Sequence, residues 1–320
     1  MRQTGAAAAI GVCAAAAAYV VEHHYLHVEW VIDAPVPVGW WVLGGILGVL
    51  GVPLLLVALG RRACPLLERP WTQLLLTWVL PCLAAHVVWL GLTLAVLRRF
   101  SPGLTGVPAR GVAEILPLVV LPPAELSLLW ALALAPVVAR STRRVPVALV
   151  IVVLCALTAL TPAPAFLAFL LVGLRLHSAI DHLAEPTTWK DLASRGAIAL
   201  AGAAAPAVGP FPDGPATVVA GLAALPLTLT AVARLRRSRL EPIGGAAVPI
   251  FLLLIPMTAL VDHVLLARLS ASAPGVQYVA AVVEPPGFVA AVVAAGVLTT
   301  VLLRRVLHRD TAPVLGETSR

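Results

Sequence analysis

Charged side chains are scarce in this chain: of its 320 residues only 12% are Asp, Glu, Lys or Arg, whereas 60% are hydrophobic. Soluble domains carry about 25% charged residues, so this composition excludes an ordinary globular protein. Apolar runs of about 20 residues, the length that crosses a bilayer as a helix, recur along the whole sequence. The sequence therefore predicts an all-α, polytopic integral membrane protein, a helical bundle whose surroundings are the lipid bilayer.

Sulfur-containing side chains are also few. The four cysteines are scattered, and no two of them have the Cys-x-x-Cys spacing of a zinc or dithiol redox site. Only two methionines occur, Met1 and Met257, so the chain offers few thioether ligands for a Cu(I) relay. The net charge of +7 comes from arginines beside the apolar runs rather than from a basic domain, and this argues for membrane topology and against nucleic-acid binding.

The sequence motifs of familiar membrane enzymes are absent. There is no His-Glu-x-x-His, no Gly-x-Ser-x-Gly, no Walker lysine, no aspartate-rich prenyltransferase motif and no set of desaturase histidine boxes. An enzymatic function thus has no motif to support it, and the sequence favours a protein that is not an enzyme.

Windows of about 19 residues predict the membrane spans. They place apolar segments at 5–22, 39–60, 72–97, 112–139, 145–175, 194–209, 215–233, 245–267 and 285–303. Pro122-Pro123 interrupts the fourth segment and Thr161-Pro162-Ala163-Pro164 the fifth, so each is expected to be kinked, re-entrant or divided into two short helices. We expect one domain, 1–309, with about 8 to 10 transmembrane helices, followed by a short polar tail, 310–320.

Arginine clusters at the span ends predict the topology, because loops rich in Arg and Lys stay in the cytoplasm. These clusters are Arg2, Arg61-Arg62, Arg140 with Arg143-Arg144, Arg234 with Arg236, Arg237 and Arg239, and Arg304-Arg305 with Arg309. All of them fit inside if 145–175 crosses the membrane twice, which gives ten spans with both termini in the cytoplasm. Arg98-Arg99 does not fit this scheme. The prediction is a multi-pass protein of the cell membrane, with Glu22–Trp30 extracytoplasmic.

The first polar stretch after an apolar run is Glu22–Trp30, which holds three of the eight histidines. A helix continuing through it would place His23 and His27 one turn apart, with His24 close in angle. Imidazole is the commonest side-chain ligand for transition metals, so these three residues are a candidate copper site. The alternative is an interfacial belt, where polar aromatic side chains gather because one end of each is wet.

Three further ionisable residues interrupt apolar runs, where such groups are costly unless they face protein or water. His86 stands in the middle of the third predicted span, and Glu114 and Glu125 flank Pro122-Pro123. A broken helix with two carboxylates is typical of a proton or substrate path, and also of a hairpin at the membrane interface. His86 is in addition a candidate metal ligand deeper in the bundle.

His177, Asp181 and His182 form the other constellation. On a helix His177 and Asp181 lie one turn apart, so the carboxylate could orient the ring or ligate a metal beside it. The residues that follow, from Glu185 to Lys190, are instead typical of a stretch lying at the membrane interface.

Three apolar stretches resemble the CtaG-like family of cytochrome c oxidase assembly proteins. Gln277–Gly287, which leads into an apolar span and Arg304-Arg305, is similar to the family's last span, with Gln277, Pro286 and Gly287 at matching spacing. Val52–Gly60 resembles its Pro-Leu-Leu-x-Leu-Gly span end. Arg69-Pro70, followed by an apolar span to His86, resembles its Arg-Pro span that ends in an aromatic-His pair.

The chain departs from that family at several motif positions. Gly275, Val283 and Glu284 stand where the family has aspartate, methionine and tryptophan, and its His-Met-x-x-His before Pro53 is missing. The resemblance implies copper handling on the extracytoplasmic side, with the histidines as ligands and with a respiratory oxidase subunit or a metallochaperone as partner.

Three functions follow from these patterns. The first is copper handling or oxidase assembly, with His23, His24 and His27 at the outer rim. The second is a proton-coupled transporter or permease subunit that uses His86, Glu114 and Glu125. The third is a metalloenzyme acting on a lipid or isoprenoid, which requires the two histidine constellations to meet in one coordination sphere. An accessory membrane protein without small-molecule chemistry remains the fourth.

Overall fold

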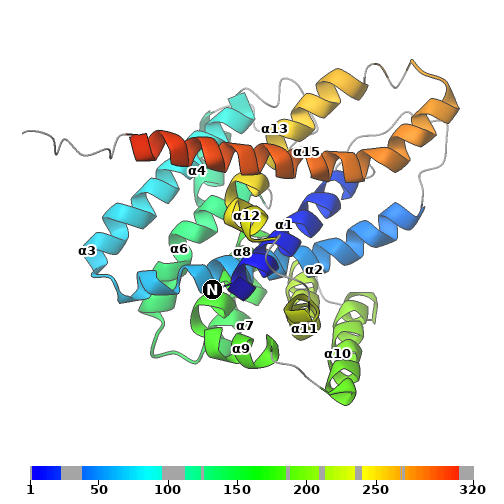
Figure 1. The fold of residues 1–320 in the computed structure, drawn as a ribbon. Coiled ribbons are helices and arrows are strands. Elements are labelled where there is room, and N and C mark those ends of the chain that lie inside the picture. The colour runs from blue at the N-terminus through cyan, green and yellow to red at the C-terminus, as the bar shows by residue number, and fades with distance from the viewer. Residues whose placement is uncertain are drawn as a thin grey trace, which may run out of the picture.

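A computed structural model describes residues 2–22, 38–95, 112–123, 126–184, 188–208, 213–234, 240–266, 268 and 271–309. Within these ranges the chain is helical and contains no strand (Figure 1). The elements in chain order are α1 (Arg2–Glu22), α2 (Val38–Arg62), the 3-10 turn η2 (Cys64–Glu68), α3 (Trp71–Leu74), the π-helical turn η3 (Leu75–Val79), α4 (Leu80–Ala95), α5 (Val112–Val120), α6 (Ser127–Ser141), α7 (Val147–Leu157), α8 (Ala163–Arg175), α9 (His177–Ala184), α10 (Trp189–Val208), α11 (Asp213–Arg234), α12 (Glu241–Gly245), α13 (Ala247–Val261), the π-helical turn η6 (Asp262–Leu266) and α15 (Pro274–Arg309).

Six helical segments in the described ranges are long and apolar enough to cross a membrane. They are Thr4–Glu22, Val42–Arg62, Trp71–Ala95, Gly214–Arg234, Ala247–Val264 and Pro274–Val306. Three shorter apolar helices, α6, α7 and α8, accompany them. The prediction of an all-α, polytopic membrane bundle is confirmed.

Proline divides the chain where the sequence predicted a break. The segment 145–175 forms two helices, α7 and α8, and the segment 112–139 forms α5 and α6 on either side of Pro122-Pro123. A proline lacks the N–H that would continue the helix and its ring clashes with the preceding turn. Pro285-Pro286 behaves differently, since α15 continues through both residues for 36 residues and begins well before the predicted start of its span. Membrane helices tolerate proline where neighbouring groups compensate the lost bond.

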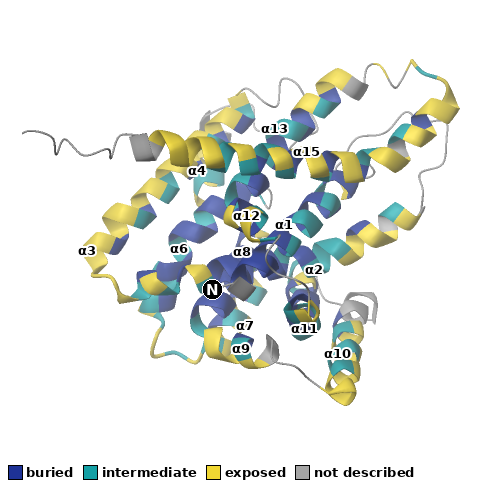
Figure 2. Cartoon of the chain, viewed as in Figure 1, coloured by how far each residue is buried: buried dark blue, intermediate teal, exposed yellow. Residues whose placement is uncertain are grey.

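The alanine-rich helix α1 lies inside the bundle and α15 lies on its outside. In the apolar window of α1 72% of the residues are buried, against 17% in that of α15 (Figure 2). Small side chains allow the backbones of α1 and α2 to approach closely, as in other membrane helix pairs. A Cβ atom on Gly11 would lie 2.5 Å from the backbone nitrogen of Leu55, and one on Gly51 would lie 2.6 Å from the Cβ of Ala14.

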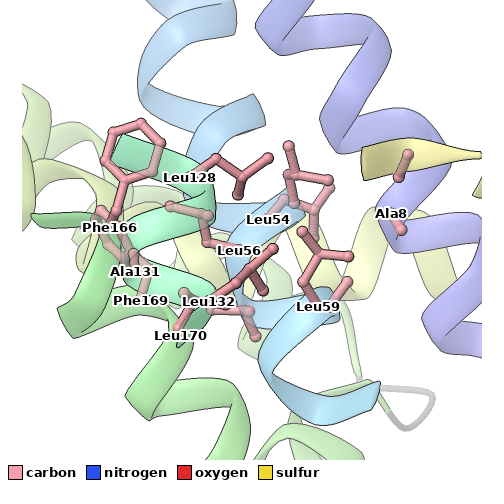
Figure 3. Close-up of a cluster of buried hydrophobic side chains, with 14 of the residues drawn as sticks. Ala8, Leu54, Leu56, Leu59, Leu128, Ala131, Leu132, Phe166, Phe169 and Leu170 are labelled. Atoms are coloured by element: carbon pink, nitrogen blue, oxygen red, sulfur yellow. The ribbon is translucent and has the colours of Figure 1, made fainter. Parts of the chain in front are cut away.

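A second close crossing joins α2 to α8. A Cβ atom on Gly60 would overlap the Leu170 carbonyl, and one on Gly173 would overlap the Val57 carbonyl. Val57, Gly60, Leu170 and Gly173 are called the α2–α8 seam below. Leucines of α2, α6 and α8 fill the core beside this crossing (Figure 3). Without side chains at the two glycines the helices touch backbone to backbone, so no space for a solute is left between them.

Several helices that carry arginine in or near their last turn lie together at one end of the bundle, which is called the arginine end below. Arg61 Nη2 forms an ion pair with Asp181 Oδ1 at 2.5 Å, which joins α2 to α9. Arg62 Nη1 donates to the Gly244 carbonyl at 2.5 Å, and a Cβ atom on Gly5 at the start of α1 would lie 3.6 Å from the same guanidinium. Arg175 closes the turn after α6 by donating to the Thr142 and Val145 carbonyls, at 3.1 and 2.8 Å.

Candidate functional site

A cavity of about 420 Å³ opens at the end of the bundle opposite the arginine end. Five helices and the turn after α7 contribute to its wall. The lining residues used below are Tyr19, Glu22, Ala165, Phe166, Phe169 and Phe251. Glu22, the last residue of α1, is exposed at the rim, whereas Phe166, Phe169 and Phe251 are buried at the bottom.

Toward the arginine end the path from this cavity is closed. The α2–α8 seam brings two helix backbones into contact, and Gly221 of α11 lies where a Cβ atom would come within 2.7 Å of Pro53 and 2.8 Å of Phe169. Beyond the seam, the Arg61–Asp181 ion pair ties the end of α2 to α9. The cavity therefore opens at one end of the bundle, and close helix packing and an ion pair lie between it and the other end.

A buried polar stripe on α4 is the second candidate feature. His86 and Thr93 are 0% exposed, and among the residues that the structure describes neither ring nitrogen of His86 nor the Thr93 hydroxyl has a hydrogen-bond partner. The indole nitrogen of Trp89 is likewise buried without a partner in this part of the chain, whereas that of Trp78 donates to the Leu132 carbonyl at 2.9 Å. His86, Trp89 and Thr93 follow a spacing of three and four residues, so they share one face of the helix. We call them the α4 polar stripe.

The His86 ring lies against the backbone of α5 just before the break at Pro122-Pro123. In a continuous helix the Leu118 and Val119 carbonyls would accept hydrogen bonds from residues 122 and 123, but proline has no N–H to give. The backbones of Leu118 and Val119 lie against the His86 ring without reaching hydrogen-bond geometry. A buried polar group without a partner costs about 1–3 kcal/mol. We assign a cost of this size to the His86 ring in this conformation.

Tyr19 of α1 lies between the two features. It lines the cavity and also packs against the small apolar cluster of Leu90, Leu126, Ile255 and Ala259 that surrounds the α4 polar stripe. His86 itself is not among the residues that line the cavity. The structure thus brings His86 next to the broken helix, and Tyr19 contacts both the cavity and the apolar cluster against which Trp89 of the stripe packs.

The predicted carboxylates of the broken helix are only partly described. Glu114 lies in the first turn of α5, one turn before Leu118. Glu125 lies outside the described residues. His23, His24 and His27 also lie outside them, directly after Glu22 at the cavity rim.

The second histidine constellation lies at the arginine end. His177 and His182 of α9 are exposed, and the Asp181 carboxylate is engaged by Arg61 rather than directed to a neighbouring ring. Among the residues that the structure describes, no group of three or more His, Cys, Asp or Glu side chains could hold a metal ion. Helix α1 separates Glu22 from Gly5 by about 26 Å, from the rise of 1.5 Å per residue. This geometry gives no support to a single metal shared by His23 and the α9 histidines.

The sequence patterns did not select Trp89, Thr93 or the phenylalanines of the cavity. Trp89 and Thr93 could have been found from their spacing behind His86, since a polar face on an apolar helix is visible in the sequence. The phenylalanines of the cavity carry no such signal, because Phe166, Phe169 and Phe251 are typical core residues in any membrane helix.

No protein family model, no curated protein and no solved structure matches this chain. The resemblance to the CtaG-like family therefore stays a prediction, and the geometry alone carries the functional argument.

Replacing Asp181 with asparagine is expected to loosen the arginine end, and Cys64 provides a native reporter. The Cys64 thiol lies 3.7 and 3.5 Å from the Gly173 and Leu174 carbonyls, and burial raises its pKa, so labelling by a maleimide should be slow. The Arg61 and Asp181 side chains are 21% and 45% exposed. Their pair is then worth no more than about 1 kcal/mol, which corresponds to an increase of up to about fivefold in labelling rate.

The labelling rate is measured by mass spectrometry with the other three cysteines replaced by serine. Asp191→Asn is the matched control, because this exposed carboxylate accepts hydrogen bonds from Thr188 at the start of α10, outside the α2–α8 seam. Equal rates in wild type and Asp181→Asn would show that the ion pair does not hold the seam closed.

Proposed function

We propose that this chain is a membrane transporter or permease subunit that exposes one central cavity alternately to the two sides of the membrane. The observation that carries the proposal is the asymmetry of the cavity, which is open beside Glu22 and closed by the α2–α8 seam. Alternating access needs a site reachable from one side and a thin, reversible barrier on the other. A half-exposed ion pair such as Arg61–Asp181 is a barrier of that kind.

His86 is the group that we assign to proton coupling. Imidazole can change its charge near neutral pH, and an ionisable residue inside a membrane protein is by default a candidate for a proton relay. Its two ring nitrogens have no hydrogen-bond partner among the described residues in this conformation. A second conformation that supplied a water chain or a hydroxyl to His86 would offset the cost of this form, and protonation would then be linked to the conformational change.

The arrangement of the ends supports an orientation with the arginine end in the cytoplasm. Counting α3–α4 and α5–α6 as one crossing each and α7 and α8 separately, the helices α1, α2, α11, α13 and α15 bring the number of crossings to nine. The ten-span scheme of the arginine clusters requires α10, which is not among the long apolar segments, as the tenth crossing. In that scheme the cavity faces the extracytoplasmic side and both termini are cytoplasmic.

Proton flux tests the proposal. The purified chain is reconstituted into liposomes that enclose a pH-sensitive dye, and a pH step is applied across the membrane. We expect the interior pH to relax faster than in protein-free liposomes, and we expect the difference to disappear in His86→Gln. His263→Gln, which changes an exposed histidine outside the α4 polar stripe, is the control. Identical relaxation with and without protein would remove proton coupling from the proposal.

Copper handling is the second candidate. Glu22 lines the cavity rim, and His23, His24 and His27 follow it closely in the sequence. A site of His23, His24 and His27 would hold copper at the entrance, with an oxidase subunit or a metallochaperone as recipient. Elemental analysis after copper loading tests it: stoichiometric copper that is lost in the double variant His23→Ala/His27→Ala supports copper handling, and no retained copper in wild type rejects it.

A further inference from the structure

We infer that the cavity binds amphipathic organic cations, molecules with an aromatic or aliphatic body and a single ammonium group. This inference rests on the proposed function, because it names the class of solute that such a transporter would carry. Polar and apolar groups occupy different parts of the cavity wall.

The bottom of the cavity is made of aromatic rings. Phe166 and Phe251 pack edge to face, with ring centroids 6.2 Å apart and an angle of 76° between the planes. Phe169 lies on the same face of α8, three residues after Phe166. These rings offer an apolar surface for the body of a ligand, and their faces also attract cations.

The rim of the cavity carries negative charge. Glu22 is the one charged side chain among the described residues that line the cavity, and Tyr19, Thr158 and Thr217 supply hydroxyl groups. The Glu22 carboxylate at the rim therefore favours a cationic head group and repels an anionic one.

The size of the cavity sets the size of the ligand. A volume of about 420 Å³ lies in the range of sites for small organic molecules, which is about 300 to 1,000 Å³. A bare metal ion or a proton would leave most of the aromatic wall in contact with water. A single-ring or two-ring amine fills the space and places its apolar body against the phenylalanines with its nitrogen toward Glu22.

The test uses three probes that share one body and differ in the head group: 4-phenylbutylammonium, 4-phenylbutanol and 4-phenylbutyrate. Binding to the full chain in detergent is measured by isothermal titration calorimetry. We expect the cation to bind about tenfold more tightly than the alcohol, the size of one charge-assisted hydrogen bond, and the anion to bind most weakly. Glu22→Gln should remove the difference between cation and alcohol, whereas Glu68→Gln, an exposed carboxylate at the arginine end, should retain it.

A second pair of variants locates the ligand. Glu22 also lines a neighbouring cavity of about 350 Å³, which contains Gly45 but no phenylalanine. Ala165→Leu narrows only the larger cavity and should reduce cation binding at least tenfold. Gly45→Leu projects only into the smaller one, where a Cβ atom meets nothing within 4 Å, and should leave binding unchanged.

Equal affinity for the three probes, or loss of binding in Gly45→Leu but not in Ala165→Leu, would overturn the assignment. The result is separable from the proposed function, because binding in detergent does not require transport. Cation binding without proton flux in liposomes would retain this site and reject proton-coupled transport. Proton flux without a preference for the cation would retain transport and reject the ligand class.

Discussion

Replacing His86 with phenylalanine is expected to raise the thermal stability of the protein and to abolish proton flux. Phenylalanine has a shape close to that of histidine but carries no polar atom. The His86 side chain is 0% exposed, and within the described ranges neither of its ring nitrogens has a hydrogen-bond partner. The wild-type side chain therefore bears a desolvation cost of about 1–3 kcal/mol that the variant avoids. A residue whose removal improves the fold but ends the activity is retained for function.

Both effects of His86→Phe are measured on one preparation. The unfolding midpoint in detergent should rise by several degrees, and the proton flux in liposomes should fall to that of protein-free vesicles. Thr93→Val is the matched comparison within the α4 polar stripe, since it also removes an unsatisfied buried hydroxyl. It should raise the midpoint with flux retained. A lower midpoint in His86→Phe would show that the imidazole stabilises the native fold and that its polar atoms are satisfied in the membrane.

Replacing Gly173 with leucine is expected to break the α2–α8 seam. A Cβ atom at Gly173 would overlap the Val57 carbonyl and lie 2.8 Å from the backbone nitrogen of Arg61. Backbone atoms cannot rotate away as a side chain does, so α2 and α8 must separate. Overpacking in a core costs about 1–3 kcal/mol even when side chains can adjust. We expect a loss at the upper end of that range or beyond it.

The separation has two readouts. The unfolding midpoint should fall sharply, and Cys64, which contacts the Gly173 carbonyl, should become reactive toward maleimide. Gly91→Leu is the matched control, because a Cβ atom at Gly91 on the outward face of α4 meets nothing within 4 Å. It should leave both readouts unchanged. If Gly173→Leu unfolds like wild type, the two helices do not touch backbone to backbone.

The fold class could be predicted from the sequence because composition and proline act locally. The apolar runs predicted the helices, and in the structure Pro122-Pro123 lie between α5 and α6 and Pro162 lies between α7 and α8. The cavity could not be predicted in this way. Its wall combines residues from five helices, half of them alanine, proline or phenylalanine, and no local pattern indicates which of these will face a space rather than a neighbour.

The candidate site residues also divide into those that a local sequence pattern reveals and those that depend on tertiary contacts. His86 could be selected from the sequence, since a histidine inside an apolar run is rare enough to suggest a role. What lies against its ring depends on a tertiary contact with the backbone of Leu118 and Val119, before the break at Pro122-Pro123. Asp181 was interpreted from its spacing to His177, yet its carboxylate pairs with Arg61, 120 positions earlier in the chain. Local spacing cannot reveal a tertiary partner of that kind.

The accessibility of a cysteine in the cavity tests alternating exposure most directly. All four native cysteines are free and half-buried, so they are replaced before Ala165→Cys is introduced beside Phe166. A membrane-impermeant maleimide is applied to vesicles of either orientation. We predict rapid labelling from the extracytoplasmic side in wild type, and a shift toward labelling from the arginine end when Asp181→Asn weakens the closed seam. Labelling from the extracytoplasmic side alone, at the same rate in both backgrounds, would contradict the account.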